Sequence, residues 1–168
     1  MFELSISADS SMYQPSETPW QDRSLNAAPA SKLPDEVFEG LHHLHVNEGE
    51  AAALSGIAAG EIENKLPEVA AYFQSRGVKN VVVTMGEKGI YFRNSKQQEG
   101  RIPIIKCKAV DTTAAGDTFA AGYISFLALH DSDDIEGALH FANRAAGLSV
   151  QRHGAQASMP FLSELEDA

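Results

Sequence analysis

The chain has 168 residues, 43 % of them hydrophobic, and its 13 Lys and Arg against 23 Asp and Glu give a formal charge of −10. This composition fits one globular domain and excludes wholesale disorder, and the acidic balance argues against nucleic acid as a partner. A single cysteine, Cys107, excludes a disulfide framework, and the longest apolar run, 120–129, is too short for a membrane span. We therefore expect a protein of the cytoplasm, with the nucleus as an additional location.

The first 24 residues differ from the rest of the chain. They are rich in Ser and Pro, and no helical or strand period persists through them. We therefore predict that residues 1–24 form a flexible extension, although Phe2, Leu4 and Ile6 alternate well enough to form a short strand.

From residue 25 onward, short apolar runs alternate with helical patterns. The predicted elements are a short helix from Pro34 through Phe38, a strand at 42–46, a helix at 48–54 ended by Gly56, a helix containing Leu66, Val69, Ala70 and Phe73 and ended by Gly77, a strand at 81–83, a hairpin of 90–92 and 102–105, a helix at 115–129, and a helix capped by Asp133 or Asp134 that runs to Leu148. This alternation predicts an α/β domain whose mostly parallel sheet is flanked by helices.

The stretch from Asp111 to Phe119 carries the clearest chemistry. Small residues at 114–116 let a ligand approach the backbone, and the N–H groups of the helix that begins there favour an anion. In the same turn, Asp117 is able to accept a proton from a hydroxyl that attacks a phosphoryl group. An equally open reading is that Asp117 is an ordinary first-turn acid and that the small residues only pack tightly.

This stretch resembles the second signature of the ribokinase-like, PfkB-type carbohydrate kinases, although Ala114 stands where the usual family form has Gly. Four further matches follow the order and spacing of the family between about residues 25 and 160. They are Leu25-Asn26-Ala27-Ala28-Pro29-Ala30 with Leu33-Pro34-Asp35, Asn47-Glu48-Gly49-Glu50-Ala51, Thr84-Met85-Gly86 with Gly89, and Ala142-Asn143 with Arg152-His153-Gly154-Ala155-Gln156.

The resemblance implies transfer of a phosphoryl group from ATP to D-ribose, giving ADP and D-ribose 5-phosphate. Asp117 would be the catalytic base and would contact the sugar, while Ala114, Ala115 and Gly116 would form an anion hole. The implied nucleotide-binding residues are Asn47, Glu50, Thr84, Gly86, Gly89 and Asn143, with Glu50 also positioning Mg²⁺ through water. The implied site for a monovalent cation, K⁺, comprises Asp111, Thr113, Ser149, Arg152, Gly154 and Ser158.

Two other functions remain open: a different sugar or nucleoside kinase of the same family, and a non-catalytic nucleotide-binding module. The resemblance covers only the C-terminal half of a family member. It implies that residues 25–168 are the nucleotide-binding half, without the N-terminal half and lid that hold most sugar contacts. We expect a sheet cut in this way to expose a surface that favours association, such as a homodimer.

Several residues also have plainer structural readings. Gly86 and Gly89 would serve equally as turn glycines, and Asn143 as a solvent-facing helix residue. Strand alternation places His43 and His45 on one face, which suggests a metal site, but the sequence places no third ligand.

Overall fold

The computed structural model describes residues 23–28, 33–130 and 133–166. The predicted strand around residues 2–6, and all but the last two residues of the predicted flexible extension, lie outside the described residues.

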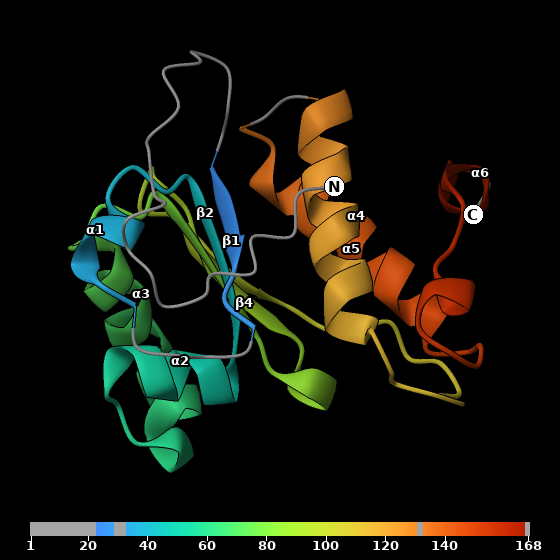
Figure 1. Ribbon diagram of the computed structural model, residues 1–168, viewed down its shortest axis with the longest axis horizontal. Helices are drawn as coiled ribbons and strands as arrows, with labels where there is room; N and C mark the ends of the chain where they lie inside the picture. Colours follow the sequence, from blue (N-terminus) through green and yellow to red (C-terminus); the bar gives the residue numbers. More distant parts are fainter. Residues whose placement is uncertain (1–22, 29–32, 131–132, 167–168) are drawn as a thin grey trace.

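The centre of the fold is a five-stranded sheet with the order β1-β2-β3-β4-β5 (Figure 1). Its strands are β1 (Ser24–Asn26), β2 (His43–Asn47), β3 (Asn80–Thr84), β4 (Ile90–Arg93) and β5 (Glu99–Ile102). The first three strands are parallel, and the last two join them through antiparallel pairings. The α/β prediction is confirmed, and the sheet is mixed because the predicted hairpin extends its parallel part.

Two strand predictions need correction. The second hairpin strand was expected at 102–105 but ends at Ile102, because Pro103 has no N–H to continue the ladder. Strand β1 was not predicted: it has only three residues, and its pairing with β2 is visible only in three dimensions.

Helices cover both faces of the sheet. They are α1 (Asp35–Phe38), α2 (Glu48–Ser55), α3 (Leu66–Gln74), α4 (Ala115–Leu129), α5 (Ile135–Ser149) and α6 (Leu162–Glu166), with 3₁₀ turns η2 (Ala59–Lys65), η3 (Gly86–Lys88) and η4 (Gln156–Ser158). Figure 1 shows α1, α2 and α3 on one side of the sheet and α4 and α5 on the other. None of the helices in the described part of the chain is long and apolar enough to cross a membrane.

The two faces carry two hydrophobic clusters. Val81 and Val83 point into the cluster of α2 and α3, while Val82 points into the cluster of α4 and α5. Successive strand residues face opposite sides, so this β-branched strand is buried on both faces as its sequence predicts.

Helix α4 is held firmly against the sheet and α5. Phe119, Tyr123 and Leu127 are buried on its inner face, whereas Ile124 is 37 % exposed. At Gly122 a side chain would come within 3.2 Å of Ala142 and Ala145 on α5. This close contact packs α4, whose first turn carries the predicted chemistry, tightly against α5.

Candidate active site

A cavity of about 200 Å³ opens where the carboxyl ends of β1, β2 and β3 meet the first turn of α4. Ligands of α/β proteins bind at this edge of a parallel sheet. The cavity brings together seven of the residues predicted from the sequence: Asn47, Glu50, Thr84, Ala114, Ala115, Gly116 and Asp117. Its other lining residues are Asn26, Ala28, His45, Val46, Thr112, Phe119 and Ala120.

The first turn of α4 offers backbone donors to this cavity. Ala114 precedes the helix with a left-handed backbone (φ 60°), and its carbonyl accepts from Thr118 at 2.8 Å. The N–H groups of Gly116 and Asp117 have no acceptor among the described residues. A Cβ placed on Gly116 would meet nothing within 4 Å, so the space above this turn is open. Unpaired amides and the helix dipole together suit an anion here.

Asn47 and Glu50 are positioned by the start of α2. The Glu50 carboxylate accepts from the Asn47 backbone N–H at 2.7 Å, and the Asn47 side chain accepts from the Glu50 N–H at 2.9 Å. This capping box orients both side chains at the end of β2. Burial raises the pKa of Glu50 and the charge of Asp117 adds to that rise, while the hydrogen bonds with Asn47 oppose it.

Asp111 ties the loop before α4 to the C-terminal segment. Its carboxylate accepts from the backbone N–H of Thr113 and from that of Gly154, both at 2.9 Å. The backbone N–H of Asp111 donates to Val150 at 3.1 Å. Hydrogen bonds to Thr113 and Gly154 lower the pKa of Asp111 to about 2.

Because the pKa of Asp111 is depressed below its ordinary 3.8, the stabilisation from its carboxylate is complete above that value and is lost as the pH falls towards 2. We expect Asp111→Asn to be less stable than the parent chain at pH 6, and the difference to shrink steadily between pH 4 and pH 2. Urea unfolding at a series of pH values measures this. A difference that stayed constant down to pH 2 would contradict a role for the ionised carboxylate.

The other predicted cation residues are only partly brought together. The backbone N–H groups of Thr113 and Gly154 both donate to the Asp111 carboxylate. The Arg152 side chain instead pairs with Glu164, with one contact at 3.3 Å. The hydroxyls of the remaining two residues donate to nearby carbonyls: Ser149 to Ala146 at 2.9 Å and Ser158 to Ala155 at 2.7 Å.

Three predicted nucleotide residues lie outside the cavity. Asn143 is buried and holds the backbone before α4, donating to Pro103 at 2.8 Å and accepting from Ile105 at 3.4 Å. It is therefore not the solvent-facing residue of the alternative reading. Gly86 and Gly89 form the turn after β3 with positive φ values of 52° and 94°.

His45 is a cavity residue that sequence reasoning considered only as a metal ligand. It stands two residues before Asn47 on β2, so strand alternation places both side chains on the same face. That spacing is the signal that would have found it. Within the described residues, no group of three or more His, Cys, Asp or Glu side chains is arranged to hold a metal ion.

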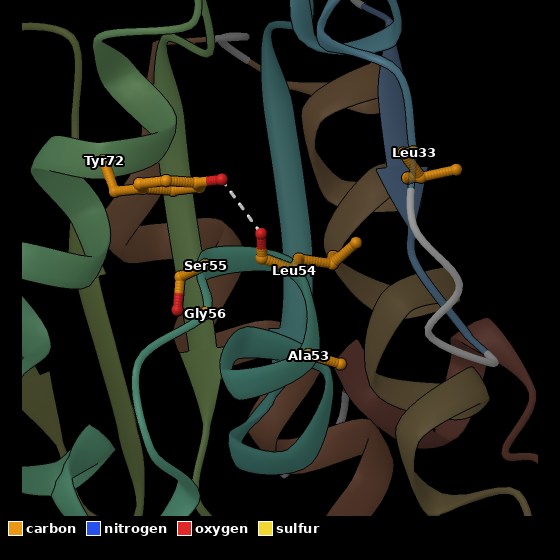
Figure 2. Close-up of a pocket in the computed structure, with 6 residues that line it drawn as sticks. All are labelled: Leu33, Ala53, Leu54, Ser55, Gly56 and Tyr72. Atoms are coloured by element: carbon orange, nitrogen blue, oxygen red, sulfur yellow. Dashed lines mark hydrogen bonds between the residues drawn. The ribbon is translucent and has the colours of Figure 1, made fainter.

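A second hollow, of about 270 Å³, lies beside α2 and α3 (Figure 2). It is lined by Leu33, Ala53, Leu54, Ser55, Gly56 and Tyr72. The Tyr72 hydroxyl donates to the Leu54 carbonyl at 3.0 Å across it. Although it is the larger of the two, it contains no carboxylate and no helix N-terminus, so the chemistry favours the cavity at α4.

The comparison with family models and the comparison with curated proteins agree with each other. Residues 12–162 match the pfkB family of carbohydrate kinases; the match begins within the stretch 1–24. The chain is 44 % identical over 141 residues to a ribokinase of Staphylococcus aureus, covering 84 % of this chain and 45 % of that protein. The chain thus spans about half the length of the curated relatives it matches.

Solved structures show the same likeness. A ribokinase of Thermotoga maritima superposes with a TM-score of 0.74 at 40 % identity, covering 85 % of this chain and 47 % of that one. A ribokinase of Arabidopsis thaliana, solved with ribose and ATP, superposes with a TM-score of 0.72 at 33 % identity, covering 81 % of this chain and 43 % of that one.

Proposed function

The chain belongs to the pfkB family of carbohydrate kinases, and we propose that it is the nucleotide-binding half of a ribokinase, which transfers the γ-phosphoryl group of ATP to the 5-hydroxyl of D-ribose. The observation that carries this proposal is the meeting of Asp117 with the unpaired amides of the α4 first turn in one open cavity. Ribokinase relatives at up to 44 % identity support the choice of sugar.

In this proposal Asp117 takes the proton of the 5-hydroxyl while that oxygen forms a bond to the γ-phosphorus. The bond from this phosphorus to the β,γ-bridging oxygen breaks, and ADP leaves with the electron pair. The unpaired amides of Gly116 and Asp117 stabilise the charge on the migrating group, in the manner of an oxyanion hole, whereas the Ala115 N–H of the predicted anion hole donates to the Thr112 carbonyl at 3.2 Å. Asn47 and Thr84, at the ends of β2 and β3, line the same cavity and would contact the nucleotide.

Mg²⁺ fits the residues of this cavity. Two carboxylates, Glu50 and Asp117, line it, and the charge of Asp117 contributes to the raised pKa of Glu50. Mg²⁺ is commonly held by one or two carboxylates, water and substrate phosphates, and it neutralises the charge of the phosphates. We propose that Glu50 positions the ion through water.

A monovalent cation and the walls of the nucleotide cleft complete the proposed site. Backbone oxygens around Ser149 and Gly154, close to Asp111, would hold K⁺ beside the anion hole. Gly86, Gly89 and Asn143 would shape the nucleotide cleft through the turns and loop they hold. We propose a cytoplasmic location, and association of two copies through exposed apolar residues such as Phe161, which is 77 % exposed.

The substitution Gly116→Ala should weaken nucleotide binding without lowering the stability of the fold. The added methyl group meets no neighbour within 4 Å, and Ala is the better helix former, so the free energy of unfolding should rise by up to about 1 kcal/mol. The same methyl projects where a phosphate would approach the backbone, so we expect the affinity for Mg·ATP to fall about tenfold or more. Calorimetric titration of the chain with Mg·ATP measures this affinity.

The matched control is Gly60→Ala, in the 3₁₀ turn η2, where an added Cβ also meets nothing within 4 Å. It should leave Mg·ATP affinity unchanged. Equal affinities of the parent and Gly116→Ala would place the phosphates elsewhere, and a parent chain that bound no nucleotide would refute the proposed function of this half.

A further inference from the structure

We propose that His45 is a substrate-binding residue whose imidazole hydrogen-bonds a hydroxyl group of the sugar. This inference rests on the proposed function, and it assigns part of sugar recognition to the half of the enzyme that is expected to bind the nucleotide.

The first observation is an imidazole whose nitrogens lack hydrogen bonds. His45 is only 3 % exposed, and among the residues that the structure describes neither of its ring nitrogens has a hydrogen-bond partner. Buried polar atoms are nearly always paired, because an unpaired one loses its hydration without compensation. The same side chain lines the cavity that holds Asn47 and Asp117. A ligand in this cavity is the natural partner for it.

The second observation is that the ring is held in place. The Tyr123 ring packs edge-on against the His45 ring with centroids 4.4 Å apart, and Phe119 lies at 6.0 Å. Tyr123 is itself fixed, since its hydroxyl lies 2.9 Å from Nδ1 of His43. These aromatic contacts come from the face of α4 just beyond Asp117 and keep the imidazole beside the cavity.

The protonation state of the His45 ring indicates which kind of ligand group it would bind. Burial lowers the pKa of His45 to about 3, and His43 adds to this effect, so the imidazole is uncharged at neutral pH. A neutral imidazole has one donor and one acceptor nitrogen, which suits a hydroxyl, whereas phosphate oxygens favour a cation. Asn26, in register with His45 on the neighbouring strand β1, lines the same cavity and adds a second neutral polar group.

Nuclear magnetic resonance of the 168-residue chain with ¹⁵N-labelled histidine rings and backbone tests this assignment. D-ribose should shift the His45 ring nitrogens, whereas sodium phosphate should shift the Gly116 amide and leave them unmoved. The exposed ring of His140 is the internal control. If ribose shifts other cavity resonances but not His45, the inference fails and the proposed function stands. If neither ribose nor Mg·ATP shifts any cavity resonance, the proposed function fails and this inference with it.

Two variants extend the test. His45→Phe removes the unpaired nitrogens and keeps an aromatic ring, so we expect a higher urea midpoint of unfolding together with about tenfold weaker ribose binding. His45→Gln, which retains a donor and an acceptor, should recover part of the ribose affinity. Mg·ATP affinity should stay unchanged in both. A His45→Phe chain that bound ribose as tightly as the parent would overturn the assignment.

Discussion

Replacing Asp117 by Asn is expected to lower ribose-dependent ADP release by about 10²- to 10⁴-fold. Asn has nearly the same shape and still accepts a hydrogen bond, but it cannot take the proton of the attacking hydroxyl. Mg·ATP affinity should change little, because the proposed anion hole is made of backbone amides. The assay uses a chimera in which the N-terminal half of the Staphylococcus aureus ribokinase precedes residue 25 of this chain, since that relative is 44 % identical to it.

A matched control is Glu136→Gln in the same chimera. Glu136 is also a first-turn acid, but it belongs to α5 and does not line the cavity. This substitution should leave turnover within about twofold of the parent, because it alters only a surface charge. Retention of more than about a tenth of the turnover in Asp117→Asn would contradict the role of this carboxylate as base.

Gly89→Ala is expected to lower the free energy of unfolding by about 3 kcal/mol. Gly89 has a φ of +94°, which non-glycine residues rarely adopt. In addition, its Cβ would stand 2.4 Å from the carbonyl oxygen of Ile102, a backbone atom that cannot turn aside. Urea unfolding of the chain at pH 7 measures the loss.

The neighbouring Gly86 is the control for this prediction. It too has a positive φ, of +52°, but an added Cβ would meet nothing within 4 Å. Gly86→Ala should therefore cost only the conformational strain, about 1 kcal/mol. Equal losses at the two positions would mean that the close approach to Ile102 is not what requires a glycine at 89.

The elements that follow from local sequence signals were predicted well. The helix at 48–55 begins where Asn47 and Glu50 form a capping box and ends at Gly56 in a left-handed conformation, and both signals are readable in the sequence. Asp134 caps α5 by accepting from Gly137 at 2.9 Å, as expected for one of the two candidate caps. Short-range hydrogen bonds of this kind depend on only a few neighbouring residues.

Features that depend on distant contacts were missed or misread. Asn143 holds the backbone at Pro103 and Ile105, some 40 residues earlier in the chain. Strand β1 exists only through its pairing with β2. Neither relation leaves a periodic signal in the sequence.

In the candidate site, too, local features were predicted from the sequence and features that depend on distant contacts were not. Residues 114–117 were singled out because they share one helix turn, and their position in one cavity with Asn47, Glu50 and Thr84 follows the general rule for parallel strands. His45 was considered only as a metal ligand, because histidine is a common ligand. Its packing against Tyr123 and Phe119 depends on the tertiary fold and could not be read from the sequence. The catalytic and binding roles of these residues stay predictions.

Ribose-dependent ADP release by the unsubstituted chimera asks whether residues 25–168 carry a working nucleotide site and base. With Mg·ATP and K⁺, we expect release that requires D-ribose and comes within about a hundredfold of the Staphylococcus aureus parent, since the chimera keeps both the proposed base and the proposed anion hole. A folded chimera that bound Mg·ATP and ribose yet released no ADP above the sugar-free control would contradict this function.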